Sequence, residues 1–192
     1  MTRIISGRAG GTVLDVPPKG TRPTSDRVRE SLFGALESAG LLDDARVADL
    51  YAGSGALGLE SLSRGAASAD LVELSAPAAA LIRKNAERLR SAGVTAAARV
   101  HRANVSTYLP ASTAQWDLVF IDPPYDVGEE ELTRVLTALA PRLSPDATVI
   151  VERAKRSPAP DWAAAGLEPQ RDRAYGDTTM WWGQPRPASQ SR

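Results

Sequence analysis

Residues 46–58 read RVADLYAGSGALG, an apolar run that leads into three spaced glycines. The run predicts a buried strand, and Gly53 and Gly55 allow the positive φ angles and the close backbone approach of a tight strand-to-helix turn. Gly58 lets the following helix pack close to the sheet, and the start of that helix offers unpaired N–H groups to a ligand. The stretch therefore predicts the first strand, loop and helix of an α/β fold.

Strands and helices alternate along the chain from this loop onward. Continuous apolar strands of this kind are typical of a parallel sheet with helices on both faces. A two-residue turn at Gly176-Asp177 predicts a terminal antiparallel hairpin, and hence a seven-stranded mixed sheet of Rossmann-like type. The expected strands are 46–51, 69–73, 98–103, 117–121, 147–152, 167–175 and 178–182, with helices near 56–64, 75–91, 104–109 and 128–141 and a short helix before residue 167.

The first residues predict a small β-hairpin extension. Segments 2–6 and 12–16 alternate around a glycine-containing turn, and Thr24 then has the features of the N-cap of a helix. We expect a hairpin extension over residues 1–20, a Rossmann-like domain over 21–183 and a flexible tail over 184–192.

Composition limits the class of protein. The 192 residues suit one domain, and 43% hydrophobic and 24% charged residues are ordinary for a globular protein. The chain has no cysteine, its one histidine is His101, and no apolar run reaches the ~18–20 residues of a membrane span. We expect a cytoplasmic monomer without a metal or a membrane partner.

Charge is unevenly distributed, although the formal net charge is zero. Residues 1–30 hold six basic and three acidic side chains. A basic arm of this kind indicates either contact with a polyanion or a solvated surface, and the charge pattern does not decide between them.

The tetrapeptide Asp122-Pro123-Pro124-Tyr125 follows a predicted buried strand. Two prolines cannot continue a strand ladder, so a carboxylate, free carbonyl groups and an aromatic ring are expected together at the carboxyl end of that strand. The carboxylate and a proline carbonyl can accept both hydrogens of a planar exocyclic amine, and Tyr125 offers a face on which a base can stack. The other interpretation is a tight turn with a helix-capping aspartate and a packed tyrosine.

A second acid completes a nucleotide-binding pattern. Glu73 lies 20 residues after Gly53 and can accept the hydroxyl groups of a ribose. An NAD enzyme shares this pattern, but Asp49 would face a diphosphate with a like charge, whereas it suits the ammonium group of S-adenosylmethionine. Asn104 either reads the adenine edge or caps the next helix.

Together these features resemble the class I S-adenosylmethionine-dependent amino-methyltransferases. Within them, segments 3–7 and 22–33 closely resemble the RsmD family, which methylates N2 of a guanine in 16S ribosomal RNA. Methylation of adenine N6 or of a protein glutamine, an NAD-dependent reaction and a non-enzymatic RNA-binding module stay as alternatives.

The resemblance implies three sets of site residues and, as partner, 16S ribosomal RNA or the assembling small subunit. The catalytic residues are Asp122, Pro123, Pro124 and Tyr125. The residues that bind S-adenosylmethionine and its product S-adenosylhomocysteine are Asp49, Tyr51, Gly53, Gly55, Glu73, Leu74, Asn104 and Val105. The residues that bind RNA phosphates are Arg3, Arg8, Lys19 and Arg22.

Overall fold

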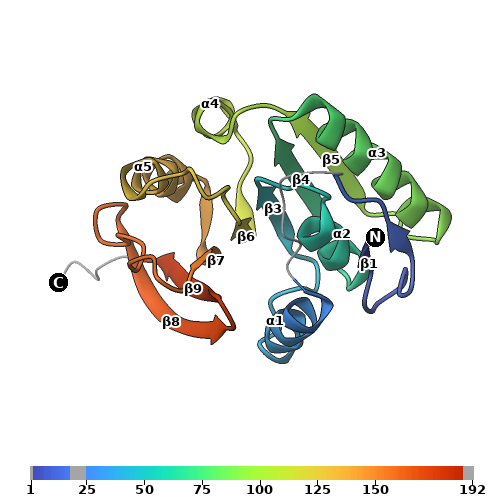
Figure 1. Ribbon diagram of the computed structural model, residues 1–192, viewed down its shortest axis with the longest axis horizontal. Coiled ribbons are helices and arrows are strands. Elements are labelled where there is room, and N and C mark those ends of the chain that lie inside the picture. Colours follow the sequence, from blue (N-terminus) through green and yellow to red (C-terminus); the bar gives the residue numbers. More distant parts are fainter. Residues whose placement is uncertain (1, 18–24, 188–192) are drawn as a thin grey trace.

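The computed structural model describes residues 2–17 and 25–187, and its main element is a seven-stranded sheet (Figure 1). The strand order is β5-β4-β3-β6-β7-β9-β8, with parallel pairing from β5 to β7 and antiparallel pairing for β9 and β8. This confirms the predicted mixed sheet. The strands are β3 (Arg46–Leu50), β4 (Ser68–Glu73), β5 (Ala97–Arg102), β6 (Trp116–Ile121), β7 (Leu143–Ala154), β8 (Leu167–Tyr175) and β9 (Thr178–Pro185).

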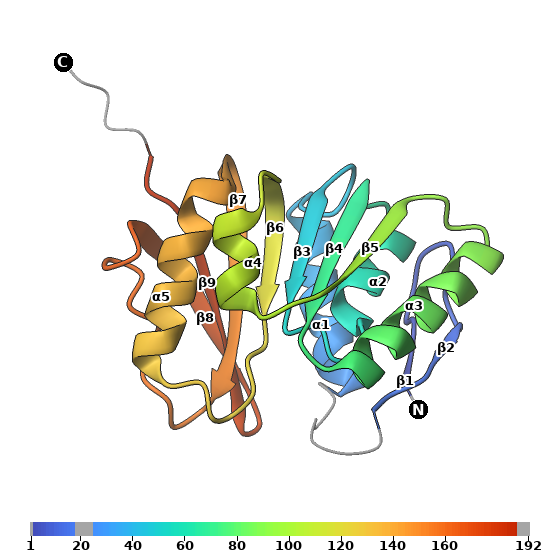
Figure 2. The same ribbon diagram turned by 90° about the horizontal axis from the view of Figure 1, so that it is seen from above.

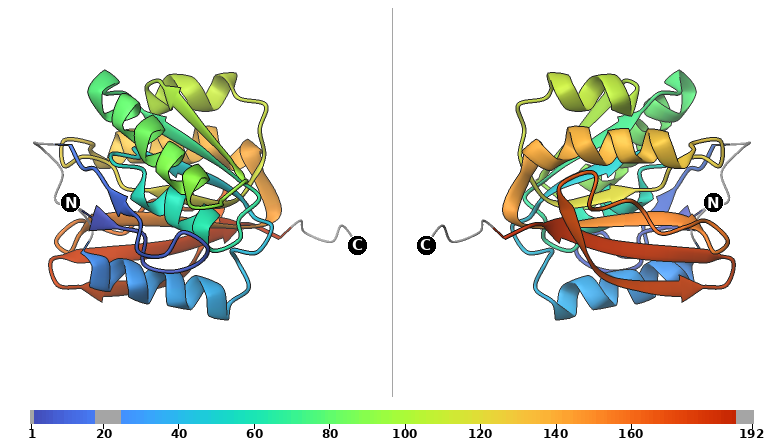
Figure 3. Two further views of the ribbon diagram at one scale, coloured as in Figure 1. Left: turned by 90° about the vertical axis from the view of Figure 1, so that its right-hand side faces the viewer. Right: turned by 90° about the vertical axis from the view of Figure 1, so that its left-hand side faces the viewer.

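Helices cover both faces of the sheet, as the apolar strands predict. One face packs against α1 (Asp26–Ser38), α2 (Ala56–Ser63) and α3 (Ala76–Ser91), and the other against α4 (Val105–Ala111) and α5 (Glu129–Leu139). A short 3₁₀ helix, Ala140–Arg142, follows α5. Figure 3 shows β8 and β9 between α1 below and α5 above. Alternate residues of each central strand enter one of two hydrophobic cores, because successive side chains point to opposite faces.

The N-terminal hairpin forms, but its strands are shorter than expected: β1 is Thr2–Arg3 and β2 is Val13–Leu14. Ile4 and Leu14 are fully buried, so the hairpin is part of the first core rather than a separate arm.

Three local expectations are corrected. The N-cap of α1 is Ser25, whose hydroxyl group accepts a hydrogen bond from the Val28 N–H at 3.3 Å, whereas Thr24 lies outside the described residues. No helix forms before β8, because the few residues between Pro160 and Gly166 form turns and Gly166 has a φ of +74°. In the predicted tail, β9 continues to Pro185, and residues 188–192 lie outside the described residues.

The carboxyl ends of the parallel strands meet at one edge of the sheet, which we call the carboxyl edge (Figure 2). From β3 the chain adds β4 and β5 on one side, and it then returns to add β6 and β7 on the other. The point between β3 and β6 is therefore the topological switch point, where open α/β sheets leave a crevice for a ligand.

Candidate active site at the carboxyl edge

The glycine loop between β3 and α2 has the predicted backbone. Gly53 and Gly55 have φ angles of +57° and +79°, which favour glycine. A Cβ atom on Gly58 would lie 2.9 Å from Leu71 Cδ2 and 3.2 Å from Asp49 Cβ. Gly58 therefore allows α2 to pack directly on the sheet and places the first turn of that helix beside Asp49.

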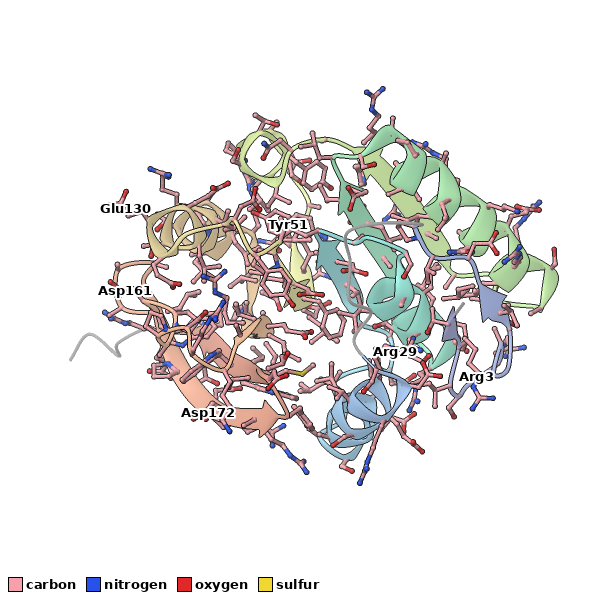
Figure 4. The ribbon with its side chains drawn as sticks, in the orientation of Figure 1. Arg3, Arg29, Tyr51, Glu130, Asp161 and Asp172 are labelled. Atoms are coloured by element: carbon pink, nitrogen blue, oxygen red, sulfur yellow. The ribbon has the colours of Figure 1, made fainter. Side chains whose placement is uncertain are left out.

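Tyr51 adopts an unusual backbone for its type. Its φ of +66° lies in the left-handed region, which non-glycine residues seldom occupy and which is frequent at ligand sites. The ring packs against the second core, and burial, with a smaller contribution from Glu131, raises the pKa of its hydroxyl group to about 12. Figure 4 shows Tyr51 at the end of β3. Its cofactor contact stays a prediction.

Asp49 is a buried carboxylate near the carboxyl end of β3. Asp49 is 2% exposed, and its Oδ2 atom accepts a hydrogen bond of 2.8 Å from the Gly58 N–H. Burial raises the pKa of Asp49 to about 7, and the nearby Glu73 adds to the rise. No cation pairs with Asp49 within the described residues. The site thus holds an acid that a positively charged ligand would stabilise in its ionised form.

Glu73 ends β4 on the other side of the glycine loop. Its Oε2 atom accepts the Gly53 N–H at 2.9 Å and its Oε1 atom accepts the Ser75 N–H at 2.8 Å. These bonds fix the carboxylate at the entrance of the loop. A carboxylate accepts about four hydrogen bonds, so lone pairs remain for the hydroxyl groups of a ribose.

Asp122 lies at the end of β6, next to the end of β3. Its backbone N–H donates to the Leu50 carbonyl oxygen at 3.4 Å, which extends the pairing of the two strands by one residue. Burial, followed by the charges of Glu152 and Asp49, raises the pKa of the Asp122 carboxyl group well above its ordinary value. Asp122 is therefore a second, half-buried acid at the ends of β3 and β6.

The proline segment leaves one carbonyl group without a hydrogen bond among the described residues. The Pro124 oxygen accepts the Val127 N–H at 3.0 Å, which closes a turn, whereas no hydrogen bond to the Pro123 oxygen is present in the part of the chain that the structure describes. Tyr125 is 81% exposed, so the interpretation with a packed tyrosine is wrong. Leu74, 63% exposed, is a second large apolar side chain left in solvent at this edge.

Asn104 acts as the N-cap of α4. Its Oδ1 atom accepts hydrogen bonds from the Ser106 N–H at 2.9 Å and from the Ser106 hydroxyl group at 2.8 Å. Val105 is buried in the second core. Of the two roles that the sequence offered for Asn104, helix capping is observed, and contact with adenine stays a prediction.

The two predicted RNA-binding residues that the structure describes, Arg3 and Arg8, lie apart. Arg3 has a side chain that is 67% exposed, and its Nε atom lies 3.8 Å from Asp26 at the start of α1 (Figure 4). Arg8 lies near the opposite edge, where its N–H donates to the oxygen of Ser63 at the end of α2 and its side chain borders an open cleft of about 570 Å³. Lys19 and Arg22 lie outside the described residues.

Sequence reasoning missed two acids and one base. Glu152 on β7 adjoins Asp122. Arg29 is 1% exposed and donates to Thr2 Oγ1, the Arg3 carbonyl oxygen and Asp26 Oδ1 at 2.7–2.8 Å. Glu60, which is fully buried, accepts the N–H groups of the hairpin at 2.7 and 3.0 Å. One feature of the sequence could have revealed the buried charges of Arg29 and Glu60. Arg29 is a charged residue on the apolar stripe of α1, together with Leu32 and Leu36.

Two negative findings concern the described residues alone. Residues 2–17 and 25–187 contain no group of three or more histidine, cysteine, aspartate or glutamate side chains that could hold a metal ion. In the same ranges, no helix is both long enough and apolar enough to span a membrane.

The strand order, the terminal antiparallel hairpin and a glycine loop at the topological switch point define the class I methyltransferase fold. The model of the family described as "Conserved hypothetical protein 95" matches residues 2–184. The chain belongs to this family, which confirms the resemblance to the RsmD family.

Individual relatives agree with this assignment. The chain is 41% identical over 151 residues to "Ribosomal RNA small subunit methyltransferase D" of Escherichia coli, which covers 78% of this chain and 73% of the relative. It is 34% identical over 157 residues to the protein of the same name from Haemophilus influenzae, covering 81% and 80% of the two chains. The solved structure of the Escherichia coli protein yhhF superposes with a TM-score of 0.79 at 34% identity, and covers 97% of this chain and 99% of that one.

Proposed function

We propose that this methyltransferase transfers a methyl group from S-adenosylmethionine to N2 of a guanine in 16S ribosomal RNA. The observation that carries the choice of cofactor is the pair of acids at the carboxyl edge, the buried Asp49 and the half-buried Asp122. Asp49 and Asp122 both have raised pKa values, mainly because of burial, and within the described residues neither has a cationic partner. A ligand with a sulfonium and an ammonium group neutralises such acids, whereas the diphosphate of NAD would add negative charge to them.

The predicted cofactor-binding residues lie along the carboxyl edge, from the end of β3 to the start of α4. Asp49 would accept the ammonium group, the backbone of Tyr51, Gly53 and Gly55 would border the methionine part, and Glu73 would accept the ribose hydroxyl groups. The adenine would lie between the exposed Leu74 and the start of α4 at Asn104 and Val105. S-adenosylmethionine, when bound, supplies an electrophilic methyl group.

The catalytic residues would bind and orient the amine that is methylated. Asp122 and the Pro123 carbonyl group accept its two N–H groups, and this favours a lone pair localised on nitrogen over one delocalised into the ring. Pro124 fixes the turn through its bond from Val127, and Tyr125 stacks on the base that has left its RNA stack. Asp122 can hold the proton released after transfer, since its pKa is raised.

The RNA substrate rests on family membership and on the names of the relatives. The Escherichia coli and Haemophilus influenzae relatives are named ribosomal RNA small subunit methyltransferases. We infer that Arg3 contacts the RNA backbone beside the carboxyl edge. Arg3 belongs to β1, and its exposed side chain lies near Asp26 at the start of α1. The same role for Arg8 requires RNA that also reaches the opposite edge.

Two measurements test the proposal. Titration of the purified protein with S-adenosylmethionine and with NAD should give saturable binding of the first alone. Transfer of labelled methyl groups to small-subunit RNA that lacks the modification should yield N2-methylguanosine after digestion to nucleosides. Label in N6-methyladenosine, or label in protein with none in RNA, would replace this function with one of its alternatives.

A further inference from the structure

Glu152 is the immediate neighbour of Asp122 across two parallel strands. Ile121 of β6 lies opposite Val151 of β7, so the next residues along the two strands are Asp122 and Glu152. Adjacent strands are only ~4.8 Å apart, which is within the reach of both side chains. The position of Glu152 is thus fixed by the register of the sheet and not by a loop.

The two carboxylates also point to the same face of the sheet. They follow Phe120 and Ile150 by two residues, and both of those side chains belong to the first core. Asp122 and Glu152 line one small, partly open cavity, and its other walls include Leu32, Leu57 and Met180. Asp122 therefore has an acid on one side and apolar groups on the other.

An acid at this position places a second negative charge beside Asp122. The residues before it, Val149, Ile150 and Val151, are buried and apolar, and a fourth apolar side chain would avoid repulsion from Asp122. Burial is the largest cause of the raised pKa of Asp122, and the charge of Glu152 is the second largest. A ligand that donates hydrogen bonds to both acids would compensate for this repulsion.

Guanine has such a pair of donors. Its N1–H and its N2 amino group lie side by side on one edge of the base, whereas adenine presents an amino group beside an N1 atom that only accepts. Two adjacent carboxylates match the donor–donor edge of guanine. Against adenine, the second carboxylate would face a lone pair.

On the basis of the proposed function, we infer that Glu152 selects guanine by accepting the N1–H hydrogen bond while Asp122 binds the N2 amino group. A carboxylate accepts about four hydrogen bonds, so Glu152 can serve this bond alongside others within the protein. Glu152 is then a specificity-determining residue.

The test compares wild type with Glu152→Gln on small-subunit RNA that carries either guanine or 2-aminopurine at the methylated position. 2-Aminopurine keeps the amino group, but its N1 atom has a lone pair in place of N–H. Wild type should prefer guanine in kcat/KM by roughly 10- to 100-fold, the factor of one charge-assisted hydrogen bond. Glu152→Gln should reduce that preference at least about tenfold, because its amide can donate to N1.

The measured quantity is a ratio within each enzyme, so a smaller folded fraction of a variant cancels. Glu87→Gln, an exposed residue of α3 paired with Arg90, is the matched control and should keep the wild-type preference. If the wild type methylates guanine and 2-aminopurine equally, or if Glu152→Gln keeps the full preference, the role of Glu152 is wrong. If the wild type methylates no guanine at N2, the proposed function itself fails.

Discussion

Two of the regions in which the molecule buries acidic groups differ in whether the protein neutralises them with its own residues. In the hairpin interface, formed by Arg29, Glu60 and Arg64 with the N-terminal hairpin, Glu60 accepts two backbone N–H groups and the Nε–H of Arg64 at 2.7 Å. At the carboxyl edge, the buried Asp49 and the half-buried Asp122 have no cationic partner in the described part of the chain. Buried charge that the protein pairs supports the fold, and buried charge that it leaves unpaired indicates a charged ligand.

The largest effect is expected from breaking the paired region. Arg29→Met removes every hydrogen bond that the guanidinium group makes to the hairpin and to Asp26, and it leaves Glu60 with one fewer nearby cation. We expect the free energy of unfolding to fall by about 3–5 kcal/mol, the usual cost of removing one partner of a buried ion pair. Denaturant unfolding measures it, with Arg27→Met at an exposed site of α1 as control. Equal stability of the two variants would contradict the stabilising role of Arg29 in the hairpin interface.

The second largest effect is expected from a substitution at the carboxyl edge, where the acids have no cationic partner among the described residues. It should appear as a lower turnover number. Asp122→Ala removes the acceptor of the amine, so kcat should fall by ~10²–10³, by analogy with loss of one oxyanion donor. The affinity for S-adenosylmethionine should change little. Asp126→Ala, an exposed acid in the same loop, is the control. Near-normal turnover of Asp122→Ala would show that the acid has no part in the reaction.

These two regions were not equally predictable from the sequence. The glycine loop and the Asp122-Pro123-Pro124-Tyr125 turn could be predicted because their chemistry lies in neighbouring residues, and parallel strands bring their carboxyl ends together. Glu152 could not be predicted, since its place beside Asp122 depends on the register of β6 and β7. Glu60 pairs with the hairpin 54 and 55 residues away, which no local pattern reveals.

The hairpin interface also changes how the RNA contact must be tested. The sequence presents residues 1–20 as a basic extension, for which deletion would be the simplest experiment. Ile4 and Leu14 are instead in the first core, and Asn85 of α3 bonds both the N–H and the carbonyl oxygen of Asp15 at 2.9 Å. Deletion would disturb the fold, so single charge substitutions are required.

A smaller effect is expected in how the stability of the protein depends on pH, and it tests the unpaired acid Asp49. Asp49 has a folded-state pKa of about 7, raised mainly by burial, against an ordinary value of 3.8. The folded protein therefore binds a proton that the unfolded chain releases, and Asp49 lowers stability progressively as pH rises from about 4 to about 7. Asp49→Asn should match the wild type near pH 4 and exceed it in melting temperature at pH 8, without ligand. The variant can keep the bond from Gly58.

The response to cofactor should be the reverse. S-adenosylmethionine should raise the melting temperature of the wild type at pH 8 more than that of Asp49→Asn, because an ammonium group stabilises only the ionised acid. A variant that shows the wild-type dependence on pH, or the full response to the cofactor, would contradict the role of Asp49.

The smallest effect is expected in the salt dependence of RNA binding, and it should differ between the two edges of the sheet. Arg3 is exposed near the start of α1 at the carboxyl edge, and Arg8 borders the cleft near the opposite edge. Arg3→Gln should lower the slope of log K for RNA against log salt by about 0.7–1, the share of one phosphate contact. Arg8→Gln should change the slope less, because an RNA base held at Asp122 places its flanking phosphates beside the carboxyl edge. Equal losses in both variants would mean that the RNA extends along the hairpin, and an unchanged slope for Arg3→Gln would remove that residue from the interface.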